Sequence, residues 1–151
     1  VTASDLSADA LVLAKDNAKL NRVDISFVLA DVFENVSGCF DIIVSNPPYI
    51  SENDKDEVGL NVLTSEPKMA LFADEEGLAI YRQILEDADK YLNPQGKLYF
   101  EIGYKQGEDL RKLLSLHFPD KHVRVLKDQF GQDRMVVMDD GKYETVKRNF
   151  E

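Results

Sequence analysis

Short runs of apolar and β-branched residues alternate along the chain with longer stretches in which apolar residues recur at helical spacing. One helical stretch follows Ser7, one starts at Gly77 and one contains Leu110. The predicted strands are, in chain order, 1–4, 25–29, 40–44, 98–102, 123–126 and 135–138. This order predicts an open α/β sheet with helices on both faces, and an antiparallel hairpin of the last two strands at one edge.

Two segments depart from simple alternation. The strand at 40–44 is almost continuously apolar, which is typical of a strand covered on both faces. The stretch 50–76 is irregular and rich in charged residues, and a short helix is predicted within it at 54–63. Because it is too long for a plain connection, we expect it to be a functional loop or a lid.

The composition is that of a single folded soluble domain. The chain has 151 residues, 44% of them apolar and 30% charged, and no apolar run approaches the roughly 20 residues of a membrane helix. Its net charge of −10 opposes binding to a phosphate backbone. We therefore expect neither a nucleic-acid partner nor a membrane partner.

Cysteine, histidine and the chain start add three smaller expectations. The single Cys39 cannot form an internal disulfide, which suits a cytoplasmic protein, and we expect it to be a small buried residue. His117 and His122 have no neighbouring ligand motif, so no metal site is predicted. The chain begins at Val1 and not at Met, so we expect its natural start to be missing.

Polar side chains follow three of the predicted strands. Asp5 and Asp31 each end a strand, and Asn46-Pro47-Pro48-Tyr49 follows the apolar strand 40–44. In open α/β sheets, ligands bind outside the carboxyl ends of the strands. One crevice is therefore predicted to contain all three positions.

The segment Asn46 to Tyr49 has the chemistry to activate a planar amino group. The nitrogen lone pair of such a group is delocalised, so an enzyme that uses it as a nucleophile must hold it with hydrogen-bond acceptors. The Asn46 side-chain carbonyl and a proline backbone carbonyl provide acceptors, and the prolines fix the loop without competing N–H groups. Tyr49 is suited to stacking on the flat amino group. The alternative interpretation of the whole segment is a plain turn after a strand.

The two aspartates fit the two ends of a nucleoside. A carboxylate such as Asp5 accepts both hydroxyls of a ribose, and Asp31 is placed to accept from an adenine amino group beside Val32 and Phe33. Taken alone, Asp5 is equally well explained as a cap before Ser7, and Asp31 as an ordinary loop acid.

A set of motifs spread over nearly the whole chain points to one family. The motifs are Asp5-Leu6-Ser7, Ala30-Asp31-Val32-Phe33, the run from Phe40 to Ile50, Glu66-Pro67 with Ala70-Leu71, Glu101-Ile102-Gly103 and Asp128-x-x-Gly131-x-Asp133-Arg134. Together they resemble the peptide chain release factor glutamine methyltransferases, the HemK/PrmC family. Asn-Pro-Pro-Tyr alone is shared with enzymes that methylate amino groups of DNA and RNA, whereas the other motifs narrow the match to the glutamine branch.

The resemblance implies a class I S-adenosylmethionine-dependent methyltransferase with a Rossmann-like sheet. Its implied substrate is the side-chain amide nitrogen of the glutamine in the Gly-Gly-Gln motif of release factors. In the roles that the resemblance implies, Asp5 binds the cofactor ribose, and Asp31 and Val32 contact its adenine. The substrate glutamine amide would be bound by the segment Asn46, Pro47, Pro48 and Tyr49. Asn46 would also lie near the cofactor. Glu66, Glu101 and Arg134 are expected to be structural, with Arg134 paired to Asp128 or Asp133.

The chain departs from this family at its front. The family has a first strand, a Gly-rich loop near the methionine part of the cofactor and a preceding helical domain, and the sequence contains none of them. We therefore expect residues 1–151 to be a partial, N-terminally truncated catalytic domain. The missing strand would leave the strands that end at Asp5 and Ser45 with unpaired edges. The alternatives are an adenine-amino methyltransferase of DNA or RNA and a non-catalytic remnant of the fold.

Overall fold

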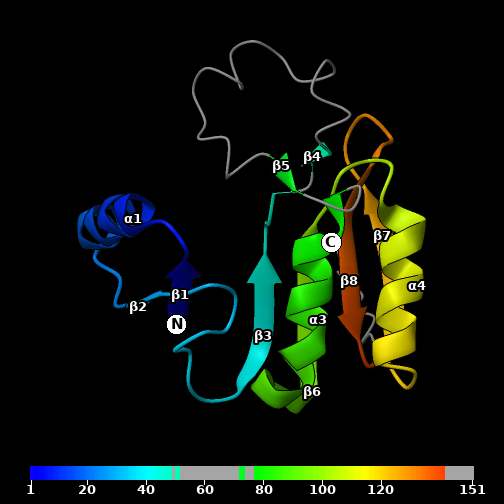
Figure 1. Ribbon diagram of the computed structural model, residues 1–151, viewed down its shortest axis with the longest axis horizontal. Coiled ribbons are helices and arrows are strands. Elements are labelled where there is room, and N and C mark those ends of the chain that lie inside the picture. Colours follow the sequence, from blue (N-terminus) through cyan, green and yellow to red (C-terminus); the bar gives the residue numbers. More distant parts are fainter. Residues whose placement is uncertain (49, 52–71, 74–76, 142–151) are drawn as a thin grey trace, which may run out of the picture.

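Apart from two short strands within the predicted loop, strands and helices follow the order predicted from the sequence. The computed structural model describes residues 1–48, 50–51, 72–73 and 77–141 (Figure 1). Its elements are β1 (Thr2–Asp5), α1 (Ala8–Asn21), β2 (Ser26–Leu29), β3 (Phe40–Ser45), β4 (Ile50–Ser51), β5 (Phe72–Ala73), α3 (Ala79–Tyr91), β6 (Leu92–Glu101), α4 (Gly107–His117), β7 (His122–Lys127) and β8 (Asp133–Asp139). The predicted helix at 54–63 and the bulk of the predicted loop lie outside the described residues.

The described strands form a four-stranded sheet and two pairs. The large sheet has the order β3-β6-β8-β7, with β3 parallel to β6 and with β6, β8 and β7 antiparallel in turn. β1 and β2 form a parallel pair, as do the two-residue strands β4 and β5. The α/β class and the antiparallel C-terminal hairpin at a sheet edge are confirmed.

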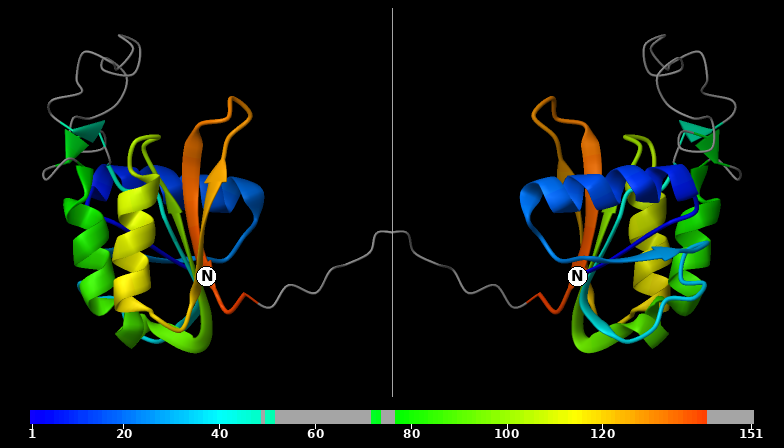
Figure 2. Two further views of the ribbon diagram at one scale, coloured as in Figure 1. Left: turned by 90° about the vertical axis from the view of Figure 1, so that its right-hand side faces the viewer. Right: turned by 90° about the vertical axis from the view of Figure 1, so that its left-hand side faces the viewer.

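The hydrophobic core lies between the large sheet and two helices. α3 and α4 lie on the same face of this sheet (Figure 2), and their buried side chains meet those of β6 and β8. Tyr81, Leu110 and Leu114 from the helices and Leu98 and Phe100 from the sheet are almost wholly buried. Burial of this kind is the main stabilising contribution to the fold.

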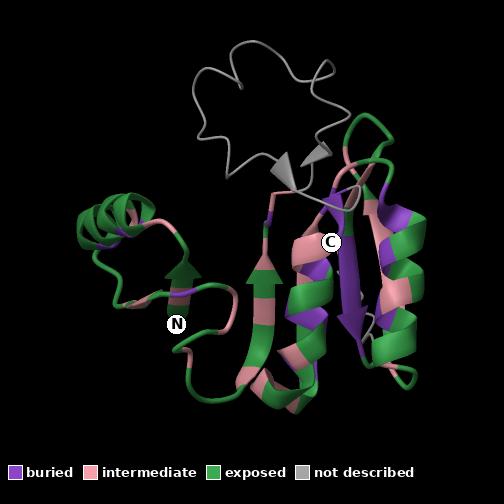
Figure 3. Cartoon of the chain, in the orientation of Figure 1, coloured by how far each residue is buried: buried purple, intermediate pink, exposed green. Residues whose placement is uncertain are grey.

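The opposite face of β3 does not follow the prediction. Ile42 and Val44 are 54% and 73% exposed, whereas Ile43, between them, packs against the core. Their exposure arises because β3 pairs with β6 alone within the described ranges, and α1 packs on β1 and β2 (Figure 3). The expectations of a strand buried on both faces and of helices on both faces are thus wrong for this part of the sheet.

Two smaller expectations also need correction. Cys39 is exposed, with its Sγ 3.5 Å from the Lys90 carbonyl oxygen. β6 starts at Leu92, earlier than predicted, because the chain enters an extended conformation directly at the end of α3. The register of β6 against β3 shifts within its first residues, from Phe40 opposite Leu92 to Ile42 opposite Lys97. No helix in the described ranges is long and apolar enough to cross a membrane.

Candidate functional site

Asp5 and Asp31 are brought together at the carboxyl edge of the β1–β2 pair. Asp5 lies opposite Leu29, and its carbonyl oxygen accepts a 3.0 Å hydrogen bond from the Ala30 N–H. Both aspartates are exposed. Their carboxylates are therefore available at neighbouring strand ends.

The Asp5 carboxylate also stabilises the turn that leads into α1. Its Oδ1 accepts a 2.7 Å hydrogen bond from the Ser7 N–H, and Ser7 Oγ accepts one of 3.2 Å from the Ala10 N–H. An ionised carboxylate has about four acceptor positions. One hydrogen bond in the turn thus leaves acceptor capacity for a ligand, and the cap and the binding role are compatible.

Asp31 is held by a side chain from another part of the chain. Gln83 Nε2 on α3 donates a 3.2 Å hydrogen bond to Asp31 Oδ1. Gln83, Asp87 and Tyr91 recur every four residues on α3 and line one side of a 330 Å³ cavity. The other side is formed by the loop that begins at Asp31.

That loop has a constrained backbone. Val32 adopts a φ of 51°, in the left-handed region that a β-branched residue rarely enters. The next residue, Phe33, stacks on Tyr91 with ring centres 4.3 Å apart, and both Val32 and Phe33 pack against the core. Packing on α3 thus supports a backbone conformation that is unfavourable in isolation, a feature frequent at ligand-binding loops.

The acceptor segment begins immediately after β3. Asn46 is exposed, Pro47 is buried and Pro48 is half-buried. The buried Pro47 anchors the segment, because its ring fixes φ while neighbouring residues hold it in place. Tyr49 lies outside the described residues.

The structure does not place all of the predicted site residues in one cavity. β1 and β3 point the same way (Figure 1). Asp5 is the last residue of β1, and Asn46 directly follows β3. However, β1 and β3 belong to separate sheets within the described residues. The cavity beside Asp31 is lined neither by Asp5 nor by Asn46. A common crevice for all three therefore stays a prediction.

Glu101 and Arg134 lie at the same edge, at the end of β6 and the start of β8. The Tyr81 hydroxyl donates a 2.6 Å hydrogen bond to the Glu101 carbonyl oxygen. Arg134 Nε is 3.4 Å from Asp128 Oδ2, and Arg134 Nη1 is 3.4 Å from the Ile102 carbonyl oxygen. The predicted ion pair of Arg134 with Asp128 is confirmed.

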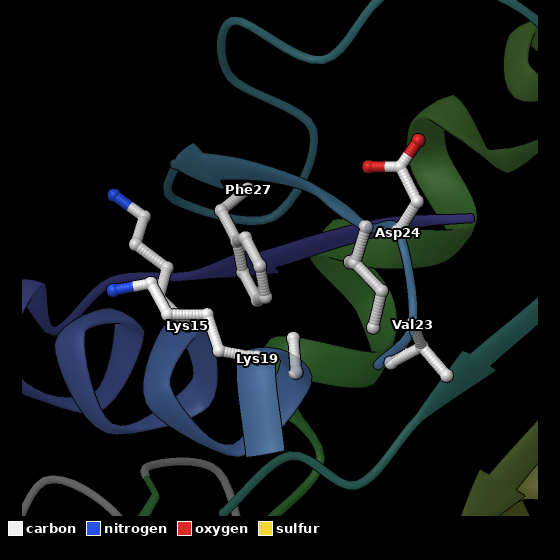
Figure 4. A pocket seen from close by; sticks show the side chains of 7 residues that line it. Lys15, Lys19, Val23, Asp24 and Phe27 are labelled. Carbon is white, nitrogen blue, oxygen red and sulfur yellow. The ribbon is translucent and has the colours of Figure 1, made fainter. Parts of the chain in front are cut away.

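A second cavity lies away from this edge. It measures 420 Å³ between α1 and β2 and is lined by Lys15, Ala18, Lys19, Val23, Asp24, Ile25 and Phe27. Figure 4 shows the Phe27 ring between the two lysine side chains and Asp24. Because 23–25 precede β2 and Asp31 follows it, the cavity lies at the opposite end of that strand. It is therefore separate from the candidate site.

Sequence reasoning missed the contribution of α3 to the Asp31 loop. The recurrence of Gln83, Asp87 and Tyr91 at four-residue intervals was a visible signal. Asp31, the partner of Gln83, lies 52 residues earlier in the chain, which helical spacing does not reveal. No metal-binding cluster of His, Cys, Asp or Glu occurs in the described part of the chain.

Known proteins of similar sequence are methyltransferases. Residues 1–71 match the family described as the methyltransferase small domain. The release factor glutamine methyltransferase of Streptococcus pneumoniae is 61% identical over 94% of this chain and 51% of its own length. That of Lactococcus lactis is 46% identical over 90% of this chain and 50% of its own length.

Solved structures show the same fold. A ribosomal protein L11 methylase from Lactobacillus delbrueckii subsp. bulgaricus has a TM-score of 0.62 at 23% identity, covering 91% of this chain and 56% of its own. A Pyrococcus furiosus methyltransferase has a TM-score of 0.63 at 21% identity, covering 94% and 63%. The architecture is thus the Rossmann-like methyltransferase fold. By sequence, the chain is similar over nearly all of its length to release factor glutamine methyltransferases, and it spans about half the length of these relatives.

Proposed function

We propose that this chain carries the acceptor segment and part of the cofactor site of a methyltransferase that modifies release factors. The methylated atom would be the side-chain amide nitrogen of the glutamine in their Gly-Gly-Gln motif. The observation that carries this proposal is the exposed Asn46 with the buried Pro47 behind it, at the carboxyl end of β3, in a chain 61% identical to a release factor glutamine methyltransferase. The cytoplasmic location expected from the sequence stays a prediction.

Asn46 and the prolines would hold the glutamine amide. The Asn46 side-chain oxygen accepts one N–H of the substrate amide, and a proline carbonyl accepts the other. Both hydrogen bonds orient the NH₂ group and oppose delocalisation of its lone pair. Tyr49 would contact the flat amide from the end of the same segment.

The aspartates fit S-adenosylmethionine as hydrogen-bond acceptors. Asp5 and Asp31 are acceptors at neighbouring strand ends, matching the hydroxyls of a ribose and the amino group of an adenine, and Val32 provides apolar contact beside Asp31. When bound, the cofactor supplies an electrophilic methyl group on a sulfonium. A Streptococcus mutans structure solved in complex with SAH shares the fold, with a TM-score of 0.58 at 15% identity.

We further propose that residues 1–151 form a partial catalytic domain that needs one more parallel strand between β1 and β3. Both strands have a free edge among the described residues, and they point the same way (Figure 1). Exposed Ile42 and Val44 lie on the strand at this gap. Unpaired edges and exposed β-branched side chains together favour insertion of a strand.

The decisive experiment is methyl transfer from labelled S-adenosylmethionine. Two proteins are compared: this chain alone, and a chimera in which it replaces the matching half of the Streptococcus pneumoniae relative. Each is offered a release factor, the same release factor with the Gly-Gly-Gln glutamine changed to alanine, and duplex DNA.

Label on the unchanged release factor, from the chimera alone, is the expected result. Label in DNA would replace the proposal by an adenine-amino methyltransferase. A folded chimera that labels neither substrate would favour a non-catalytic remnant. Equal activity of the isolated chain would contradict the proposed need for a further strand.

A further inference from the structure

The turn between β7 and β8 is held rigid by its own side chains. Asp128 Oδ1 accepts hydrogen bonds of 2.8 Å from the Phe130 N–H and 3.1 Å from the Gln132 N–H. The Gln132 carbonyl accepts a further 2.8 Å bond from the Asp128 N–H. Gly131, with a φ of 79°, permits the reversal. The turn therefore has few alternative conformations to lose when a partner binds.

Phe130 lies at the tip of this turn, and its side chain is exposed to solvent. Phe130 is 79% exposed, although the backbone beneath it is fixed. Moving an exposed phenylalanine ring from water into contact with a partner gives a large favourable transfer free energy. A rigid backbone lowers the conformational entropy that is lost when the ring is fixed against the partner. The combination is typical of an anchor residue for a protein partner.

The tip is also electrically neutral on an acidic chain. Residues 129–132 carry no charge. The charged side chains on either side of them pair with one another, Lys127 with Asp133 at 2.9 Å and Arg134 with Asp128 at 3.4 Å. A neutral protrusion suits an apolar protein surface better than a phosphate backbone, to which the chain offers a net charge of −10.

The turn lies at the edge of the sheet that holds the acceptor segment. β3 is adjacent to β6 and β6 to β8, and Ser45, Phe100 and Val136 are paired in one row across them. Two strand spacings separate β8 from β3, roughly 10 Å. Figure 2 shows the hairpin extending past the ends of α3 and α4. A substrate protein at Asn46 is therefore within reach of the tip.

We propose that Phe130 docks the protein substrate, by entering an apolar depression beside the glutamine that is modified. This inference rests on the proposed function and extends it to recognition of the folded substrate. Asp128 and Arg134 support the docking element and do not act in the reaction.

The test compares the Phe130→Ala chimera with the unchanged chimera on an intact release factor and on a short peptide containing Gly-Gly-Gln. Leu116→Ala is the matched control, because Leu116 is 77% exposed and lies near the end of α4, at the opposite edge of the sheet. The ratio of kcat/KM for the release factor to kcat/KM for the peptide should fall about tenfold in Phe130→Ala. It should change less than twofold in Leu116→Ala and be largely restored in Phe130→Leu.

The outcomes separate this inference from the proposed function. If the unchanged chimera labels no release factor, the proposed function itself is overturned. If the unchanged chimera is active and Phe130→Ala matches Leu116→Ala, docking by Phe130 is overturned. Phe130→Ala could also lose binding to single-stranded RNA or DNA while the ratio of the two kcat/KM values stays unchanged. That result would overturn docking of the protein substrate and indicate that Phe130 stacks on a nucleic-acid base.

Discussion

Gln83 and Asp31, 52 residues apart in the chain, are joined by a 3.2 Å hydrogen bond from Gln83 Nε2 to Asp31 Oδ1. The bond occupies one oxygen of the carboxylate and orients the other. Gln83 lies on α3, the helix that packs on the large sheet. Its hydrogen bond therefore fixes the position of Asp31, the proposed adenine contact, relative to the hydrophobic core.

Replacing Gln83 should weaken binding of the cofactor product through Asp31. In the chimera, Gln83→Ala should raise the Kd for S-adenosylhomocysteine about fivefold, the usual magnitude for loss of one orienting hydrogen bond. Titration calorimetry measures this directly. An analogue that lacks the adenine amino group should bind both proteins equally, and Glu86→Ala, an exposed change on the same helix, is the control. An equal loss for both ligands would contradict the assigned role.

Removing the Asn46 side chain should abolish most transfer and leave folding intact. In the chimera, Asn46→Ala should lower kcat about 100-fold, because an oriented substrate amide is replaced by a free one. The melting temperature should be unchanged, since Asn46 is exposed. Asn17→Ala, an exposed change on α1, is the matched control. Turnover within twofold of the unchanged chimera would refute the role of Asn46.

The charge of Asp128 should stabilise the β7–β8 turn in a pH-dependent way. Burial acts to raise the pKa of Asp128, but hydrogen bonds from the backbone of Gln132 and Phe130, together with Arg134, outweigh it. The pKa therefore lies below the ordinary value of 3.8. The charged form thus favours the folded state above about pH 4, and this contribution is lost as the pH falls through the lowered pKa.

Asp128→Asn should accordingly be less stable than the unchanged protein at neutral pH, and the difference should shrink as the pH falls below about 4. Chemical denaturation between pH 3 and pH 7 gives the two curves. Asp120→Asn, in an exposed connection, is the control for general charge effects. A difference that grows on acidification would show that the assigned sign is wrong.

The Tyr81 hydroxyl should contribute measurably to stability. Tyr81→Phe removes the 2.6 Å hydrogen bond to the Glu101 carbonyl and keeps the ring that meets Phe100 edge to face. The free energy of unfolding should fall by about 1 kcal/mol. Tyr99→Phe, half-buried on the other face of β6, is the comparison in urea denaturation. Equal stability of the Tyr81 and Tyr99 variants would contradict this prediction.

Local signals account for what could be predicted of the fold. Ser7 marked the start of α1, and the alternating pattern of 98–102 marked β6, because caps and side-chain periodicity depend on nearby residues. The coverage of Ile42 and Val44 depends instead on elements far away in the chain, and the prediction for them was wrong.

The site divides in the same way. Asp5, Asp31 and Asn46 were found because each lies at or just after the carboxyl end of a strand. Gln83 and Phe130 were not, because one acts through a distant partner and the other through a turn whose rigidity depends on the Asp128 side chain.

The separation of the β1–β2 pair from the large sheet has a consequence for local opening. β6 is hydrogen-bonded on both sides, by β3 and β8, and lies over the core, so its amide protons should exchange with solvent only when the whole sheet unfolds. The amides of β1 and β2 share one ladder with each other and should exchange at lower free energy. Filling the gap beside β1 would slow their exchange toward the rate of β6, and isotope labelling would register that closure amide by amide.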